Sequence, residues 1–281
     1  MTFGRWPLLA AFPLLALAGC TAVIDQATFF PQALTPPQET LTPPPNYVVT
    51  DAMLALPGLG NVHAVRLDNP ASDTAIVYSG GNGSFVSALT PFAAALADAA
   101  HADLILYDYP GRGGTDVPPT IDAAIATGPL LVQELRRRGW IGRGPLFAYG
   151  FSFGGSQAAA MAREGGFDGL ILEGTTADIQ AVGRNFVPGI AKPFVRLRVD
   201  PALGRFDYLG YAVSAHAPIL LIGAEGDRVV RPRNVSAFAD LLRARGTDVT
   251  RISVPGVHGT ALRDPEARAA LGRFVAAHSS R

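Results

Sequence analysis

The residues with the clearest chemical potential surround Ser152. Residues 146–157 read L-F-A-Y-G-F-S-F-G-G-S-Q, an apolar run that breaks at G-F-S-F-G and resumes as a stretch of small residues. This pattern predicts a strand, a tight turn and a helix with Ser152 at the apex, because side chains at Gly150 or Gly154 would clash with the neighbouring strand and helix. A serine hydroxyl held clear of a sheet in this way is placed to attack a carbonyl carbon.

A nucleophilic serine needs a histidine base, and the histidine needs a group that orients it. For a serine on a strand-turn-helix corner, the partners follow in the order Ser, Asp or Glu, His, each on a loop after a later strand. Of the five histidines, His258 alone meets this requirement, in S-V-P-G-V-H-G, where Pro255 and Gly256 end a predicted strand. We therefore expect His258 to be the base.

The acid is expected on the loop after the apolar strand 218–223, which continues as A-E-G-D. Asp227 is the better candidate, and Glu225 is its close rival. Glu173 ends the predicted strand before it and could also reach the site from there. A carboxylate in this position fixes the tautomer of the imidazole and stabilises the imidazolium.

An oxyanion formed at the carbonyl needs two backbone N–H donors, one directly after the nucleophile and one after an earlier strand. The first donor is Phe153. The second should follow the strand 74–78, where the sequence reads S-G-G-N-G over residues 79–83. We assign it to Asn82, with Gly81 as the alternative, because the glycines let the backbone approach a ligand closely.

Six stretches match one family in order and spacing, between about residues 62 and 278: I-V-Y-S-G-G-N-G (76–83), L-Y-D-Y-P-G-R-G-G-T (106–115), Y-G-F-S-F-G-G (149–155), L-I-L-E-G-T-T-A-D-I (170–179), L-L-I-G-A-E-G-D (220–227) and S-V-P-G-V-H-G (253–259). The chain resembles the α/β-hydrolase fold, and within it the Bem46 and ABHD13/ABHD17-type serine hydrolases. The resemblance implies the triad Ser152, Asp227 and His258. It departs from the family at Gly80, where a histidine is usual, and at Gly174, where a serine is common.

The rest of the domain alternates between strands and helices. Strands are expected near 62–67, 74–79, 103–108, 145–150, 168–172, 218–223 and 249–254, and helices near 92–100, 121–138, 236–245 and 265–278. Such repeated units predict an α/β fold with a mostly parallel sheet covered by helices on both faces. Residues 178–215 show no long strand, and their place resembles the small cap over the active site of this fold. An apolar cap favours an acyl or aromatic substrate group, although simple packing also explains it.

The first 19 residues resemble a bacterial lipoprotein signal peptide. Arg5 precedes a short apolar stretch that ends in L-A-G-C, and Cys20 is the only cysteine. We expect Cys20 to be lipidated; the alternatives are an ordinary secreted protein cut near Gly19 and an unremarkable apolar N-terminus. Thr21 follows, and the absence of aspartate there resembles an outer-membrane address facing the periplasm in Gram-negative bacteria. The expected localisation is the bacterial cell envelope.

Residues 20–46 are rich in proline and are expected to form a tether between the lipid and the hydrolase domain, 47–281. An N-terminal arm laid along the domain surface is the alternative. Lys and Arg together number 23, as do Asp and Glu, so nothing indicates a nucleic-acid partner. No nucleotide fingerprint or Cys/His cluster is present, so we expect no cofactor and no metal. The sequence carries no signal for an oligomeric state.

The sequence therefore predicts a lipid-anchored serine hydrolase that cleaves a small-molecule ester, thioester or amide through an acyl-enzyme on Ser152. Two alternatives remain open at this point. One is an acyltransferase with the same triad, in which an alcohol or amine replaces water. The other is a catalytically silent envelope protein that uses the fold as a binding surface.

Overall fold

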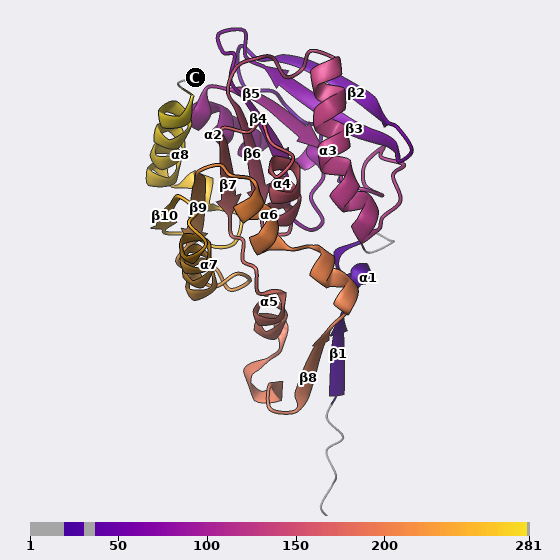
Figure 1. The fold of residues 1–281 in the computed structure, drawn as a ribbon, viewed down its shortest axis with the longest axis vertical. Coiled ribbons are helices and arrows are strands. Elements are labelled where there is room, and N and C mark those ends of the chain that lie inside the picture. The colour runs from indigo at the N-terminus through magenta and orange to yellow at the C-terminus, as the bar shows by residue number, and fades with distance from the viewer. Residues whose placement is uncertain (1–19, 31–36, 280–281) are drawn as a thin grey trace, which may run out of the picture.

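The computed structural model describes residues 20–30 and 37–279, so the predicted signal peptide (1–19) lies outside the described residues. Its centre is an eight-stranded sheet of order β10-β9-β7-β6-β4-β5-β3-β2 (Figure 1). Its strands are β2 (Val48–Leu56), β3 (Gly60–Asp68), β4 (Ala75–Ser79), β5 (Asp103–Tyr107), β6 (Leu146–Phe151), β7 (Gly169–Glu173), β9 (Ile219–Ala224) and β10 (Val249–Val254). β2 and β3 run antiparallel to their neighbours, and the remaining pairs are parallel. The predicted α/β fold with a mostly parallel sheet is confirmed.

All seven expected strands are present, and β2 is an addition at the edge of the sheet. The central strands β4, β5, β7 and β9 are buried along their whole length, which explains why each reads as a continuous apolar run. β2 is exposed along most of its length and pairs with a neighbour on one side only. Its apolar pattern is correspondingly weak, so β2 could not be predicted from the sequence.

Helices cover both faces of the sheet and enclose two cores. α2 (Thr90–Ala100) and α8 (Pro265–His278) pack on one face, where Leu96 and Leu271 are fully buried. α3 (Ile121–Arg137), α4 (Gly154–Ala162) and α7 (Pro232–Ala244) contribute to the core on the other face. Burial of apolar surface in these two layers is the main contribution to the stability of such a fold.

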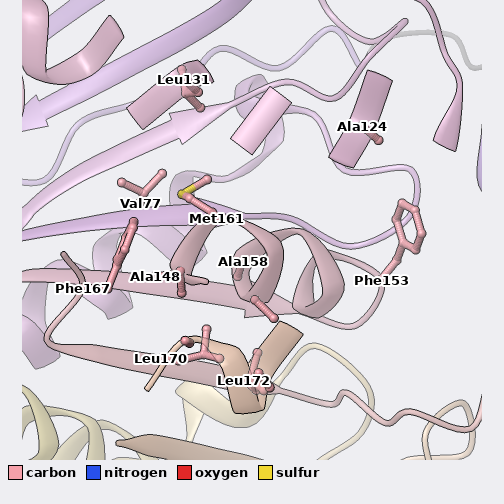
Figure 2. Close-up of a cluster of buried hydrophobic side chains, with 14 of the residues drawn as sticks. Val77, Ala124, Leu131, Ala148, Phe153, Ala158, Met161, Phe167, Leu170 and Leu172 are labelled. Carbon is pink, nitrogen blue, oxygen red and sulfur yellow. The ribbon is translucent and has the colours of Figure 1, made fainter. Parts of the chain in front are cut away.

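α4 lies at the centre of the second core and is buried on all sides. Its small residues allow close packing against the sheet, α3 and α6 (Tyr208–Ser214). Figure 2 shows Ala158 and Met161 of this helix in one cluster with Val77 and Ala148 of the sheet and Leu131 of α3. Because α4 follows Ser152 directly, this packing fixes the position of the serine.

The predicted cap region, 178–215, contains α5 (Ile179–Phe186), β8 (Val195–Val199) and α6, inserted between β7 and β9. β8 was not expected. It forms a separate two-stranded parallel sheet with β1 (Cys20–Ile24), a segment far away in the sequence. Figure 1 shows α5, β8 and β1 projecting together from the body of the domain. Such non-local pairing leaves little signal in the sequence of either strand alone.

The N-terminal segment 20–30 packs against the domain. It therefore resembles an arm laid along the domain surface more than an extended tether. Ile24 and Phe30 are buried, at 8% and 3% exposure. α1 (Gln26–Phe29) begins at Asp25, whose carboxylate accepts a hydrogen bond from the N–H of Thr28. A proline-rich composition favours an extended chain, but these apolar side chains precede the prolines and bury themselves under the cap. Among the described residues, no helix combines the length and apolarity needed to cross a bilayer.

Candidate active site

Ser152 occupies a sharp corner between β6 and α4, as its sequence pattern predicts. Its φ is +53°, a conformation that costs a residue other than glycine on the order of 1–3 kcal/mol. Its N–H donates to the carbonyl of Glu173 at 2.8 Å, which anchors the corner to β7. A Cβ on Gly154 would lie 2.0 Å from the carbonyl oxygen of Ser79, and one on Gly150 would lie 2.5 Å from the Cα of Gly155. Both glycines of the motif are therefore required by sterics.

The structure brings Ser152, His258 and Asp227 together from three separate loops. The Oγ of Ser152 lies 2.9 Å from Nε2 of His258, and Nδ1 of His258 lies 2.7 Å from Oδ2 of Asp227. A proton on Nδ1 donates to the carboxylate and leaves Nε2 to accept the proton of the serine hydroxyl. This is the arrangement in which a histidine can deprotonate a serine.

Asp227 is held firmly in place. It is 4% exposed, and its Oδ1 accepts backbone hydrogen bonds from Val229 at 2.8 Å and Val230 at 2.9 Å. These bonds occupy one carboxylate oxygen and leave Oδ2 directed at His258. The aspartate thus orients the imidazole without depending on a neighbouring cation.

The two rival carboxylates have other surroundings. Glu173 is buried and accepts hydrogen bonds from the hydroxyl of Tyr149 at 2.6 Å and from the N–H of Ala261 at 3.2 Å. Burial raises the pKa of Glu173 above its ordinary value. Glu225 is exposed on the loop. Within the described residues, neither glutamate makes a hydrogen bond to His258.

The loop 79–83 lies beside the serine, where an oxyanion donor is required. A Cβ on Gly81 would lie 3.6 Å from the Cβ of Ser152. Phe153 is the N-cap of α4, a position whose N–H has no partner within the helix. Asn82 lines the same cavity as Ser152, and its side-chain amide donates to the carbonyl of Thr28 at 3.0 Å. Asn82 and Gly81 therefore both remain candidates for the second donor.

Gly80 and Gly174, where the sequence departs from the family that it resembles, both lie in tight places. A Cβ on Gly80 would lie 2.5 Å from the Oγ of Ser84, so a larger side chain there has to displace that serine. Gly174 has a φ of +54°, and a Cβ on it would lie 3.3 Å from the ring of His258. A side chain at either position would therefore crowd a neighbouring residue.

A cavity of about 500 Å³ opens from Ser152. The N-terminal segment, the cap and the loops after β4, β7 and β9 all contribute to its wall, which is mostly apolar: Ala22, Val23, Ile24, Thr28, Phe29, Asn82, Ser152, Phe153, Gly174, Thr175, Thr176, Ile179, Val182, Gly183, Phe186, Val187, Leu197, Tyr208, Val229 and Val230. Two aromatic residues of the cap, Phe186 and Tyr208, line it. A cavity of this size and character suits an acyl or aromatic group.

Sequence reasoning missed the part of this wall formed by the N-terminal segment. Phe29 stacks on Phe153 with ring centroids 4.6 Å apart, and Phe30 contacts the same ring edge-on at 5.8 Å. Two adjacent aromatic residues directly before the prolines were the available signal, because a solvated tether has no use for them. Within residues 20–30 and 37–279, no group of three or more potential metal ligands gathers.

The sequence matches no protein-family model and no curated protein. Solved structures do resemble it. The esterase Pf2001 of Pyrococcus furiosus superposes with a TM-score of 0.68 at 17% identity, covering 88% of this chain and 98% of that one. Carboxyl esterase 2 of Tuber melanosporum gives 0.62 at 15% identity, covering 88% and 93%, and an esterase of Pyrobaculum calidifontis gives 0.59 at 21%, covering 84% and 86%. The chain has the α/β-hydrolase fold.

Proposed function

We propose that this protein is a serine hydrolase that cleaves a carboxylic ester of a small-molecule acyl substrate. The observation that carries the proposal is the continuous hydrogen-bond chain from Asp227 through His258 to Ser152, at 2.7 and 2.9 Å, beside an apolar cavity. The esterases with the same fold add support, although a fold alone does not determine a reaction. Thioesters and amides are further substrates of the same chemistry.

Each residue has one role in the proposed reaction. His258 takes the proton of Ser152 as the Oγ attacks the carbonyl carbon, and Asp227 stabilises the imidazolium that forms. The N–H of Phe153 and a second N–H, from Asn82 or its alternative Gly81, stabilise the oxyanion. His258 then gives its proton to the leaving alcohol. In the second half of the reaction His258 takes a proton from water as the water attacks the acyl-enzyme, and it returns the proton to the Oγ of Ser152 as the acid leaves.

A fluorophosphonate tests this proposal directly. Its phosphorus bonds to an activated serine Oγ and fluoride leaves, which adds a defined mass. Every described element lies within residues 20–279 and the cavity lining begins at Ala22, so a chain of residues 21–281 keeps the described site. We expect one adduct on the wild type, mapped to Ser152, and none on Ser152→Ala or His258→Ala. No adduct on a protein shown to be folded would overturn the proposal and favour a silent binding protein.

We also propose that Cys20 is lipidated and anchors the protein in the bacterial cell envelope, at the outer membrane facing the periplasm in a Gram-negative cell. Cys20 is free and exposed, and it is the only cysteine of the chain. In cells, Cys20→Ser should move the protein from the membrane to the soluble fraction. An unchanged distribution would contradict the lipid anchor and leave the hydrolase proposal untouched.

A further inference from the structure

The outer surface of the cap carries an unusual concentration of positive charge. Arg184, Lys192, Arg196 and Arg198 surround a hollow of about 580 Å³, which also includes Thr21. No acidic residue occurs between positions 179 and 199, in a chain whose net charge is zero. Within the described residues, none of the four cations has an ion-pair partner, whereas Arg205 nearby pairs with Asp122. These charges are therefore available to an anionic partner.

Large apolar side chains are also exposed on the segments that line this hollow. Ile190 is 88% exposed, Phe186 68%, Val23 53% and Phe194 48%. These four are nearly half of the nine large apolar residues exposed on the described chain, although the segments that carry them are short. We call this surface, residues 184–198 with 20–23, the cap tip. Exposed apolar groups rimmed by Lys and Arg are typical of surfaces that lie in the interface of a bilayer.

β8 contributes side chains both to the substrate cavity and to the basic hollow. Its side chains alternate, so Leu197 faces the cavity while Arg196 and Arg198 point to the exterior. β1 lies beside it in register, with Thr21 opposite Arg196 and Val23 opposite Arg198. Leu197 thus contributes to the substrate cavity, while Arg196 and Arg198 are exposed on the same strand.

The chain outside the structure leaves from this same end. Cys20, where the description begins, pairs with Val195 at the start of β8. Figure 1 shows that the beginning of β1 and the loop before β8 lie at the far end of the projecting cap. The lipid proposed for Cys20 therefore attaches to the molecule at the cap tip.

We infer that the cap tip docks on an anionic phospholipid bilayer, with lipid phosphates in the basic hollow and Ile190 and Phe194 inserted among the acyl chains. Phe186 and Val23 are exposed and also line the cavity, so docking turns the opening of the cavity toward the bilayer. This contact is independent of the lipid on Cys20 and of catalysis. Its consequence is that acyl substrates reach Ser152 from the membrane.

Vesicle co-sedimentation tests the inference with a chain of residues 20–281 carrying Cys20→Ser, which holds every described element and no lipid. We expect binding to phosphatidylglycerol/phosphatidylcholine vesicles, weakened by added salt, and little binding to pure phosphatidylcholine. The triple variant Arg184→Glu, Arg196→Glu and Arg198→Glu should bind at least about tenfold more weakly. Ile190→Ser with Phe194→Ser should also weaken binding, because the inserted apolar area is lost.

A matched control reverses the same amount of charge away from the cap. Arg245→Glu, Arg251→Glu and Arg273→Glu change exposed arginines near α7, in β10 and in α8. This variant should bind anionic vesicles within about twofold of the parent, since screening confines the attraction to charges close to the membrane. Circular dichroism and thermal unfolding of all variants check that the fold is retained, whether or not Ser152 is reactive. Equal loss in both triple variants, retained binding in the cap variant, equal binding to both vesicle types, or no binding at all would overturn the inference.

Lys192 offers a second test that needs no charge variant, because it is the only lysine in the sequence. Its rate of acetylation, followed by peptide mass spectrometry, should fall when anionic vesicles are added and stay unchanged with neutral vesicles. Protection that appears without vesicles and grows with protein concentration would indicate a second copy of the chain on the cap tip. That result would overturn membrane docking.

Discussion

Phe29 stacks on Phe153, with ring centroids 4.6 Å apart and planes inclined by 21°. Phe153 directly follows the candidate nucleophile, so a residue from the N-terminal segment supports the peptide that is expected to bind the oxyanion. The same segment donates Ala22, Ile24 and Phe29 to the cavity wall. The segment between the candidate lipid site and the hydrolase domain is thus part of the active-site structure.

Phe29→Ala should therefore weaken catalysis although Phe29 is outside the triad. An aromatic pair contributes about 0.5–1.5 kcal/mol beyond its buried area, which corresponds to roughly a 2- to 10-fold effect. We expect kcat/KM for a short-chain ester to fall by this amount, mostly through KM, since the cavity wall loses one side. Phe29→Leu, which keeps most of the volume, should recover much of the loss. Unchanged kinetics in Phe29→Ala would show that the segment only covers the domain.

The three carboxylates near the site should differ strongly in their effect on rate. Asp227→Asn removes the acceptor for Nδ1 of His258 and should lower kcat by about 10⁴. Glu225→Gln, on the exposed part of the loop, should stay within about twofold of the wild type. Esterase assays at saturating substrate, with thermal unfolding as a check of the fold, distinguish these outcomes.

Glu173→Gln is the more demanding comparison because Glu173 is buried beside the site. The amide oxygen can still accept from Ala261, and the exchange removes a charge that burial disfavours. Because burial raises the pKa of Glu173, the folded protein holds this proton more tightly than the unfolded chain, and its ionisation lowers stability as pH rises. Glu173→Gln should therefore lower kcat by less than tenfold. Its stability relative to the wild type should be greater at pH 8 than at pH 5. A loss as large as that of Asp227→Asn would make Glu173 the orienting acid.

The candidate triad could be predicted because its signals are local. In a parallel sheet the loops after the strands meet at one edge, so the order of Ser152, Asp227 and His258 along the chain is enough to select them. The buried strands were readable for a similar reason: a strand covered on both faces is a continuous apolar run. What the sequence could not supply was the choice between Asn82 and Gly81, because that depends on where each N–H points.

The parts that were missed depend on contacts between distant segments. β1 and β8 pair across more than half of the chain, and neither has a distinctive pattern alone. Gly183 shows how specific this pairing is: a Cβ there would lie 2.2 Å from the Cδ1 of Ile24. The glycine in α5 therefore lets β1 approach, a constraint that is visible only when both segments are placed.

Gly174 allows a test of a difference from the resembled family, where serine is common. Its positive φ disfavours any side chain by about 1–2 kcal/mol, and a Cβ would press on the ring of His258 at 3.3 Å. We expect Gly174→Ala to be less stable by about this amount and to lose activity as the imidazole shifts from Ser152. Gly189→Ala is the matched control, because no atom lies within 4 Å of its added Cβ, and it should stay within about 0.5 kcal/mol.

Gly174→Ser separates sterics from hydrogen bonding at the same position. The added Cβ would lie 3.5 Å from Oδ2 of Asp227, so a hydroxyl on it is within reach of that carboxylate. If the hydroxyl bonds to the carboxylate, Gly174→Ser should be more active than Gly174→Ala at similar stability. Chemical denaturation and ester hydrolysis measured on the same preparations give both quantities. Wild-type stability and rate in both variants would show that the loop adapts without glycine.

His63, a residue outside the triad, should make the stability of the protein depend on pH. Its Nδ1 lies 2.6 Å from Oδ2 of Asp108, and its Nε2 lies 3.1 Å from Oδ1 of Asp51 in β2. The hydrogen bond with Asp108, opposed by burial and aided by both negative charges, raises the pKa of His63 above its ordinary value. The folded protein thus binds this proton more tightly than the unfolded chain does.

The stabilisation from His63 is therefore complete below the pKa of the unfolded chain, about 6.5, and is lost as pH rises through the higher folded value. His63→Gln should cost about 1–2 kcal/mol of unfolding free energy at pH 5.5 and distinctly less at pH 8.5. Asp51→Asn should keep most of the stabilisation that protonated His63 gives the wild type at pH 5.5. The reason is that Asp108 is the stronger partner of His63 and Asp51 is mostly exposed. Urea unfolding of the three proteins at both pH values measures it. If His63→Gln destabilised the protein equally at both pH values, or more at pH 8.5, the stabilising hydrogen bond between protonated His63 and Asp108 would be contradicted.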